Sequence, residues 1–340
     1  MSEYVIPSVS IPPGQLVTAQ SFLIDRIKAD VEIISLPEKT IPGGAVAWTT
    51  GPVQAVPQRA KRMRAFLPTP KAVAPEGRWI IDLRRQSPSN WAHFLNNHLP
   101  LTFALTEKAG LDPAACLALL PKDTPGYILK VAALFGLEVM ATDDLVEGTG
   151  LTYSVSPWIA VRAVRADWAR LAQPAAVIET LKAETPDQDL PRKVFLSRQD
   201  TRVLSNEAEI ERLLAGRGFQ KVYPETLSAA DQLRLFRGAE EMVAVHGAGL
   251  APLLYCTPGA GPRLLVEILP AGHMTDVFRA IAHRVGSAWI GVRGRIKPEY
   301  IRPAYQIDQD KFTAYSLDAF EVDPVSLEQA FDLAVASQEY

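Results

Sequence analysis

The C-terminal half of this chain alternates short apolar runs with amphipathic segments, and this alternation constrains the fold more than any other feature. The apolar runs are bounded by turn residues and are too short for helices, so they predict strands. They lie at residues 193–197, 219–223, 242–245, 263–269 and 288–292. Such alternation is typical of an α/β fold with a parallel sheet, helices on both faces and ligands at the carboxyl ends of the strands.

The segments between these strands carry helix signals. Asn206 with Glu209, and Ser228 with Asp231, have the spacing of helix N-terminal caps. Residues 273–285 have helical spacing as well. We therefore predict three helices that connect the strands of this half.

The N-terminal half also predicts α/β structure, although its beginning is less regular. Strands are expected at 78–83, 117–120 and 137–141, with helices at 90–107 and 127–135. Residues 1–75 are rich in proline and predict irregular β structure, with short strands at 31–36 and 45–49. A last helix is expected from Pro324 onward, with its apolar residues on one face.

A chain of 340 residues is long enough for two domains. We predict an N-terminal α/β domain over 1–160, a connecting segment over 161–192 and a C-terminal domain over 193–297. Residues 298–340 are expected to be a tail that packs back on the N-terminal domain.

Charge and cysteine content narrow the function. The net charge of −3 does not suggest a nucleic-acid-binding protein, which would need a basic face. Cys116 and Cys256 lie in no motif and predict neither a disulfide framework nor a zinc site. No signal peptide and no membrane span are expected, so a cytoplasmic location is predicted. The basic cluster at 59–64 is expected to be a solvated face, with contact to anionic lipid-linked material at the membrane as the alternative.

The sequence His-Gly-Ala-Gly-Leu at 246–250 follows the predicted strand 242–245 directly. Glycines after a strand permit a tight turn and close approach of backbone N–H groups to a ligand. A helix that opens there would direct its positive end at the same point, which suits phosphate or diphosphate. Pro252 stands where a dinucleotide fingerprint has a third glycine, so an NAD-binding loop is only half matched. An esterase is disfavoured because the chain has no Gly-x-Ser-x-Gly elbow.

Three stretches in order make the chain similar to a known family. They are Asn90-Trp91-Ala92-His93-Phe94 reaching Leu99-Pro100; Phe195-Leu196-Ser197-Arg198 with Arg202 and Asn206-Glu207; and the 246–250 loop with Pro258-Gly259-Ala260 and Val266-Glu267. With this set the chain resembles glycosyltransferase family 61, in its bacterial capsular-polysaccharide form, over about residues 78–290.

The resemblance implies a GT-B architecture, in which two Rossmann-like domains face each other across a cleft. The C-terminal domain would bind a nucleoside-diphosphate sugar, and the N-terminal domain would bind a saccharide or lipid-linked glycan acceptor. It also implies an inverting transferase of surface polysaccharide biosynthesis that uses no metal and no other cofactor.

For the donor we predict contacts from residues at the carboxyl ends of the C-terminal strands. Without a metal, arginines and backbone N–H groups are the usual partners of a leaving diphosphate. The predicted donor-binding residues are Arg198, Arg202, His246, Gly247, Ala248, Gly249, Leu250 and Glu267. Among them Glu267 is the candidate for the ribose hydroxyls, with a strand-end salt bridge as the alternative.

Inversion needs a base near the acceptor hydroxyl, and the candidates are His93 and His246. A second interpretation of His246 is that it binds the donor sugar or orients the glycine loop. Asn90, His93 and Asn97 are the predicted acceptor-side residues. The family often has Asp at the position of Asn97, and Asn cannot act as a base.

Two further observations bear on alternatives. The Asp-x-Asp patterns at 187–189 and 308–310 resemble metal-binding motifs of another transferase architecture, but we interpret them as solvated surface. The Asn97 departure leaves open a non-catalytic protein that binds nucleotide or glycan. The strand–glycine–helix unit leaves open, as a third choice, an NAD-dependent oxidoreductase.

Overall fold

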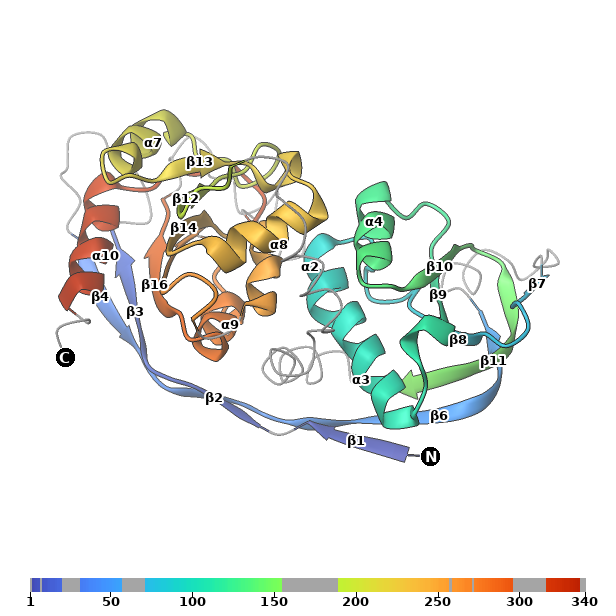
Figure 1. The fold of residues 1–340 in the computed structure, drawn as a ribbon. Helices are drawn as coiled ribbons and strands as arrows, with labels where there is room; N and C mark the ends of the chain where they lie inside the picture. The colour runs from blue at the N-terminus through green and yellow to red at the C-terminus, as the bar shows by residue number, and fades with distance from the viewer. Residues whose placement is uncertain are drawn as a thin grey trace, which may run out of the picture. The chain divides into compact units, whose positions relative to one another are not determined.

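The computed structural model describes residues 2–6, 8–19, 31–56, 71–154, 189–256, 259–270, 272–295 and 316–336. The chain divides into two compact units, which are described separately below (Figure 1). The first unit comprises Met1–Val9 and Thr40–Thr185, and the second comprises Ser10–Lys39 and Pro186–Tyr340. β2 (Val9–Ile11) and β5 (Lys39–Ile41) pair in a small two-stranded sheet.

The second unit contains a sheet in the order β13-β12-β14-β15-β16-β3-β4. All neighbouring strands are parallel except the last pair, β3 and β4. The bounds are β3 Gly14–Thr18, β4 Glu32–Leu36, β12 Lys193–Leu196, β13 Gln220–Val222, β14 Glu241–Val245, β15 Leu264–Leu269 and β16 Ala288–Arg293. The five strands predicted in this half are therefore confirmed as a parallel array.

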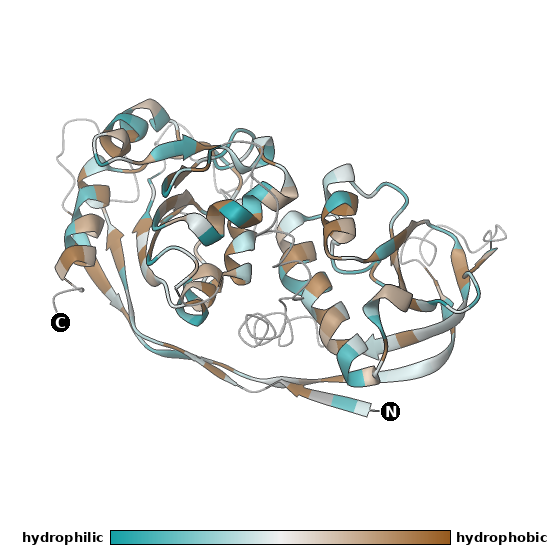
Figure 2. Cartoon of the chain, viewed as in Figure 1, coloured by the Kyte–Doolittle hydropathy of each residue, from teal (hydrophilic) through white to brown (hydrophobic). Residues whose placement is uncertain are grey.

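Helices connect these strands and cover the sheet. They are α7 (Glu207–Ala215), α8 (Ala229–Gly238), a 3₁₀ helix (Ala248–Tyr255) and α9 (Val277–Arg284), followed by α10 (Pro324–Ala336). α7 and α8 show alternating hydrophilic and hydrophobic stripes in Figure 2, as expected for helices half covered by a sheet.

One face of this sheet forms a single apolar core with α7 and α10. Because strand side chains alternate between faces, every second residue of the central strands belongs to it. Its members include Phe195, Ile210, Leu214, Val243, Val245, Val266, Ile268, Ile290, Val292, Leu327 and Phe331. The intervening residues, Glu267 and Trp289 among them, therefore point to the opposite face, on the side of α9.

One predicted cap is confirmed and one works differently. Ser228 accepts a hydrogen bond from the Asp231 N–H, as a helix N-cap should. The Asn206 side chain does not cap α7. It exchanges hydrogen bonds with the backbone of Val322 instead, and so attaches the C-terminal segment to this unit.

Two segments from the ends of the chain complete the second unit, contrary to the predicted domain scheme. β3 and β4 extend the sheet beyond β16, although the sequence predicts residues 1–160 to be the N-terminal domain. The described part of the 298–340 tail packs in the second unit rather than on the N-terminal domain; Figure 1 shows α10 in red beside β3 and β4. The physical reason is that Leu327, Ala330 and Phe331 fill the apolar face of the sheet.

The first unit has a mixed sheet in the order β1-β6-β11-β8-β9-β10, with β7 paired to β11. β8, β9 and β10 are parallel, and β6 pairs antiparallel with β1 and β11. The bounds are β1 Ser2–Ile6, β6 Gly44–Ala55, β7 Lys71–Val73, β8 Trp79–Asp82, β9 Cys116–Leu120, β10 Glu138–Ala141 and β11 Leu145–Ser154. This unit is also α/β, as predicted.

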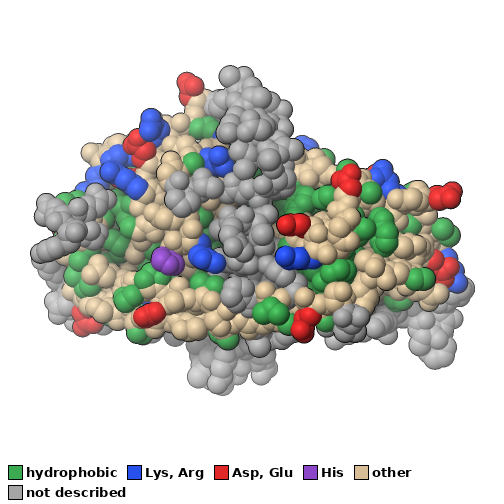
Figure 3. Space-filling view, turned by 60° about the horizontal axis from the view of Figure 1, so that its bottom comes forward, with side chains coloured by type: hydrophobic (Ala, Val, Ile, Leu, Met, Phe, Trp, Pro, Cys, Tyr) green, Lys and Arg blue, Asp and Glu red, His purple; other side chains and the backbone are tan. Residues whose placement is uncertain are grey.

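The predicted helix at 90–107 is one continuous element with a change of winding. α2 (Trp91–His93) passes through a π-helical turn (Phe94–His98) into α3 (Leu99–Ala109). α3 is largely hydrophobic in Figure 2, because most of its first two turns are buried. α4 (Gly126–Leu134) connects β9 to β10, as expected. On the face of the molecule that Figure 3 draws, positive and negative side chains are interspersed.

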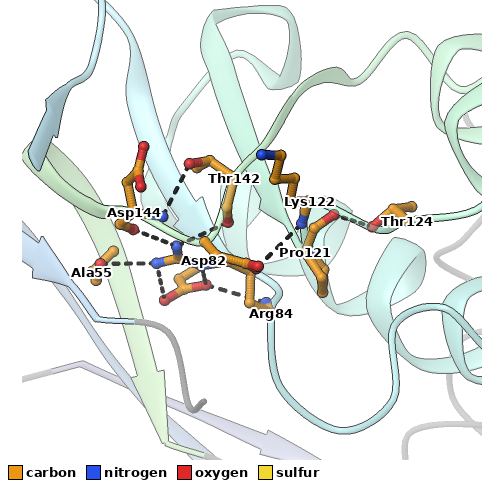
Figure 4. A network of polar contacts seen from close by, with 9 residues as sticks. Ala55, Asp82, Arg84, Pro121, Lys122, Thr124, Thr142 and Asp144 are labelled. Atoms are coloured by element: carbon orange, nitrogen blue, oxygen red, sulfur yellow. Dashed lines mark hydrogen bonds and ion pairs between the residues drawn. The ribbon is translucent and has the colours of Figure 1, made fainter. Parts of the chain in front are cut away.

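A buried arginine holds the strand ends of the first unit together (Figure 4). Arg84 makes a two-point ion pair with Asp82, at distances of 2.9 and 3.2 Å. It also donates to the carbonyl oxygens of Ala55, Thr142 and Asp144. Asp82 ends β8 and Ala55 ends β6, whereas Thr142 and Asp144 lie in the loop between β10 and β11, so one guanidinium binds acceptors at or next to the ends of four strands.

We predict that Arg84→Met lowers the free energy of unfolding by about 3–5 kcal/mol, because it leaves a partly buried carboxylate and three carbonyls without their donor. Urea unfolding monitored by circular dichroism measures this loss. Arg85→Met is the matched control, since Arg85 is exposed. Equal losses for the two variants would contradict the role given to Arg84.

Candidate functional site

The second unit has a point where the strand order reverses. From β12 the chain moves to β13 on one side and then to β14 on the other. In doubly wound sheets the crevice outside the carboxyl ends of such a pair is where ligands bind. β12 ends at Leu196 and β14 at Val245, so Arg198 and the glycine loop at 246–250 follow directly at this position.

Arg198 is held against the glycine loop. Its Nε donates to the Thr201 carbonyl oxygen at 2.7 Å, and Nη2 donates to Thr201 Oγ1 at 2.9 Å. A Cβ added at Gly247 would lie 1.8 Å from Arg198 Nη1. Only glycine therefore leaves space at 247 for this guanidinium.

The two glycines of the loop are needed because neighbouring side chains leave no room for a Cβ, and Gly247 does not have an unusual backbone angle. Gly247 has a φ of 162°, which is extended backbone. A Cβ at Gly249 would lie 2.8 Å from the Pro224 ring. The sequence predicts that these glycines permit a tight turn. In the structure they instead allow two close contacts, of Arg198 with Gly247 and of Pro224 with Gly249.

The 3₁₀ helix Ala248–Tyr255 begins at this loop. Leu250 is fully buried, and its N–H donates to the Gly247 carbonyl oxygen at 3.1 Å. The N–H groups of Ala248 and Gly249, at the helix start, have no acceptor within the helix. The helix therefore presents backbone donors and its positive end at the carboxyl end of β14.

Arg202 is fixed beside the same loop by the C-terminal segment. Its Nε donates to the Ser316 carbonyl oxygen at 2.6 Å, and its Nη1 lies 3.5 Å from the carbonyl oxygen of His246. The backbone of Arg202 has a φ of 58°, an uncommon conformation for a non-glycine residue. Its N–H donates to the Leu317 carbonyl oxygen, so residues 316 and 317 hold it on both sides.

Burial lowers the pKa of both arginines, which we call the arginine pair. The pKa of Arg202 falls to about 10, through burial first and then through the positive charge of Arg198. The pKa of Arg198 is also lowered by burial, against the opposing effect of Glu225 and Asp200. The positive charge of Arg198 disfavours the charged form of Arg202, and an anion beside the arginine pair would favour it.

Glu267 does not face solvent. It has no exposed surface; Oε1 lies 2.6 Å from His246 Nδ1, and Oε2 accepts from Trp289 Nε1 at 2.7 Å. The predicted contact with ribose hydroxyls needs an accessible carboxylate, and this arrangement does not offer one. The Glu267 carboxylate contacts the His246 ring instead.

The His246 ring also contacts two other rings. His273 lies 5.2 Å away between centroids, and Phe278 lies 5.6 Å away in an edge-on arrangement. Burial, with smaller effects of His246 and Arg202, lowers the pKa of His273 to about 4. His273 is therefore neutral at neutral pH and adds no charge beside His246.

In the first unit, the predicted acceptor-side residues lie together at the start of the π-containing helix. Asn90 caps it, since its Oδ1 accepts from the His93 N–H at 3.1 Å. Asn97 Nδ2 lies 3.0 Å from His93 Nδ1, one helical turn on. Single π turns within α-helices are frequent at functional sites.

His98 ends the π turn and lines a cavity of about 410 Å³. Its Nε2 lies 3.3 Å from the Gln86 carbonyl oxygen, and burial lowers its pKa to about 4. Polar residues from β8, β11 and the loop after β8 also line the cavity: Asp82, Arg85, Gln86, Thr152 and Tyr153.

Comparison with known families identifies the class of protein. The family model described as Glycosyltransferase 61 matches residues 91–261, half of the chain. This chain belongs to glycosyltransferase family 61, which supports a glycosyltransferase activity. No curated protein matches the chain.

Sequence reasoning did not identify several residues that shape the site. Thr201 and Ser316 orient the arginine pair, while His273, Phe278 and Trp289 surround His246 and Glu267. Trp289 was inside a predicted strand, and the parallel pairing of β15 and β16 is the signal that would have placed it near Glu267. Ser316 carried no local signal, because its contact spans 114 residues of sequence.

Some predicted features lie outside the described residues. These are Pro258, the basic cluster at 59–64, Asp187, and both aspartates of 308–310. Within the part of the chain that is described, no helix is long and apolar enough to cross a membrane.

The lowered pKa of His98 predicts acid sensitivity of the fold. An unfolded histidine binds a proton near pH 6.5, whereas folded His98 does so only near pH 4. The contribution of neutral His98 to the free energy of unfolding is therefore fully present above pH 6.5. It is lost as pH falls through about 4, by an amount on the order of 3 kcal/mol. Urea unfolding of the wild type and His98→Gln between pH 7 and 4 measures this. The variant should lose less stability on acidification, and identical pH profiles would contradict the argument.

Proposed function

We propose that this chain is an inverting glycosyltransferase that transfers a sugar from a nucleoside-diphosphate sugar to a hydroxyl of a glycan in surface polysaccharide biosynthesis. The donor binds at the carboxyl ends of β12 and β14. The acceptor is a saccharide or a lipid-linked glycan, and Asn90, His93 and Asn97 lie on its side.

One observation carries the proposal: the arginine pair and the start of a helix converge where the strand order reverses. Arg198 lies against Gly247, Arg202 reaches the His246 carbonyl, and the helix begins at Ala248. Guanidinium groups and helix N-termini are the protein groups best suited to phosphate oxygens. A diphosphate would offset the repulsion between the two arginines.

The same groups supply what the reaction needs without a metal. When the bond between the anomeric carbon and the phosphate oxygen breaks, negative charge grows on the leaving diphosphate. Fixed cations at this point stabilise that charge in the transition state, as a bound metal ion does in other enzymes. We accordingly propose a metal-independent reaction with no cofactor besides the sugar nucleotide.

The proposal includes the GT-B architecture and the cytoplasmic location expected from the sequence, at the inner face of the membrane when the acceptor is lipid-linked. Support for the architecture is that each unit by itself is an α/β sheet with helices. Support for the reaction class is family membership.

Arg198→Ala tests the donor site. We expect UDP or GDP, rather than CMP, to bind the wild type and its affinity to fall at least about tenfold in the variant, because a charged hydrogen bond to phosphate contributes about 1.5–3 kcal/mol. Isothermal titration calorimetry measures this, with NADH as a fourth ligand. Arg212→Ala is the matched control, since Arg212 is exposed on α7.

A second variant displaces the Arg198 guanidinium without removing it. Gly247→Ala should lower the affinity for the same nucleotide, because the added Cβ would displace the Arg198 guanidinium. Gly238→Ala is its control, since a Cβ there meets nothing within 4 Å. Binding of NADH alone, or unchanged nucleotide affinity in both variants, would contradict the proposal.

A further inference from the structure

We infer that Glu267 and Trp289 are positioning residues that hold His246 with its proton on Nδ1. His246 Nε2 is then the base that accepts the proton of the attacking hydroxyl. The tautomer follows from the geometry alone, whereas the role as base rests on the proposed function.

The buried carboxylate of Glu267 links His246 to the partly buried side chain of Trp289. Glu267 has no exposed surface, and each of its oxygens has one partner, His246 Nδ1 at 2.6 Å and Trp289 Nε1 at 2.7 Å. A buried carboxylate with a single partner on each oxygen has little freedom to rotate. It therefore fixes the plane of the His246 ring as well as its distance.

Sheet register creates this arrangement. Gly291 on β16 pairs directly with Glu267 on β15, and Trp289 is two residues earlier on the same face. A Cβ at Gly291 would lie 2.6 Å from the Trp289 ring. The glycine opposite Glu267 thus leaves room for the indole to reach the carboxylate.

The donors and acceptors determine where the proton lies. The indole N–H only donates, and an ionised carboxylate only accepts. Glu267 Oε1 therefore accepts from His246 Nδ1–H, and a neutral ring must carry its lone pair on Nε2. A buried carboxylate in this position also stabilises the imidazolium that forms when Nε2 takes a proton.

The surroundings leave Nε2 for substrate. Among the described residues Nε2 has no hydrogen-bond partner, and the side chain keeps 6% of its surface exposed. The neighbouring His273 is neutral at neutral pH, and Phe278 is apolar. A lone pair repels phosphate oxygens, so the ligand group that fits Nε2 is a hydroxyl.

The step balances as follows. The acceptor oxygen attacks the anomeric carbon of the donor while its proton passes to His246 Nε2. The bond between that carbon and the phosphate oxygen breaks, and its electron pair stays on the leaving diphosphate beside the arginine pair. The imidazolium is paired with Glu267.

The other candidate base has the opposite arrangement. Asn97 Nδ2 lies 3.0 Å from His93 Nδ1. An amide nitrogen only donates, so His93 Nδ1 accepts and the neutral ring carries its proton on Nε2. With the lone pair of Nδ1 engaged by Asn97, the neutral His93 ring is less suited than His246 to take the proton of the acceptor.

Nitrogen-15 NMR of the histidine rings tests the tautomer without substrate. The chain has five histidines, so His246→Asn identifies the signal of residue 246. Spectra recorded at a pH at which the ring is neutral should show a pyrrole-type signal from Nδ1 and a pyridine-type signal from Nε2. The opposite tautomer of the neutral ring would overturn the inference.

Glu267→Gln should reverse this tautomer. Trp289 can only donate, so the amide oxygen must face the indole and the amide NH₂ must face His246 Nδ1. The ring proton then moves to Nε2. In the double variant Glu267→Gln with Trp289→Phe, the amide is free to turn round, and the original tautomer should return. Glu241→Gln, at the opposite end of the neighbouring strand β14, is the matched control that should leave it unchanged.

Sugar transfer measured in the same variants tests the role as base. Glu267→Gln should lower kcat about 100- to 10,000-fold with KM within about threefold, as loss of a correctly oriented base does. The double variant should recover kcat at least about tenfold over Glu267→Gln, because the two changes are coupled. Additive losses would indicate a merely structural role and overturn the inference.

The outcomes separate this inference from the proposed function. Transfer that persists in Glu267→Gln with kcat within about threefold overturns the base while leaving a glycosyltransferase. A wild type that binds no nucleotide and transfers no sugar overturns the proposed function and the base role with it. In that case the NMR result still decides the tautomer.

Discussion

Repulsion between two partly buried arginines is the constraint on which the site depends. Arg198 is kept in place by Thr201 and by the absence of a side chain at Gly247. Arg202 is kept in place by the Ser316 carbonyl and by its left-handed backbone. The groups that hydrogen-bond the two guanidinium groups are neutral, and the carboxylates of Glu225 and Asp200 partly offset the charge of Arg198. Under the proposed function, an anionic substrate would lower the energy of this arrangement further. Backbone donors at Ala248 and Gly249 add to the same field.

The site is assembled from distant parts of one unit. Residues 316 and 317 fix Arg202, and Phe320 and α10 belong to the core beneath the sheet. The sequence 14–18 adds β3 next to β16, which carries Trp289. The C-terminal segment therefore orients Arg202, one of the proposed donor-binding residues, as well as covering the sheet.

Local sequence signals were sufficient to predict much of the second unit and part of the candidate site. Apolar runs located β12 to β16, the Ser228 cap located α8, and strand ends located Arg198 and His246. Contacts at long sequence separation were not accessible: Asn206 binds Val322, and Glu267 is enclosed by Trp289 and His246. A carboxylate at a strand end has the same sequence signature whether it is exposed to ribose or buried against histidine. Only the register of β15 against β16 distinguishes the two.

A crystal structure with the nucleoside diphosphate that binds best tests the central claim most directly. We expect diphosphate oxygens within hydrogen-bonding distance of Arg198 and of the N–H groups of Ala248 and Gly249, beside the carboxyl ends of β12 and β14. A nucleotide bound elsewhere, with Arg198 still held only by Thr201, would contradict it.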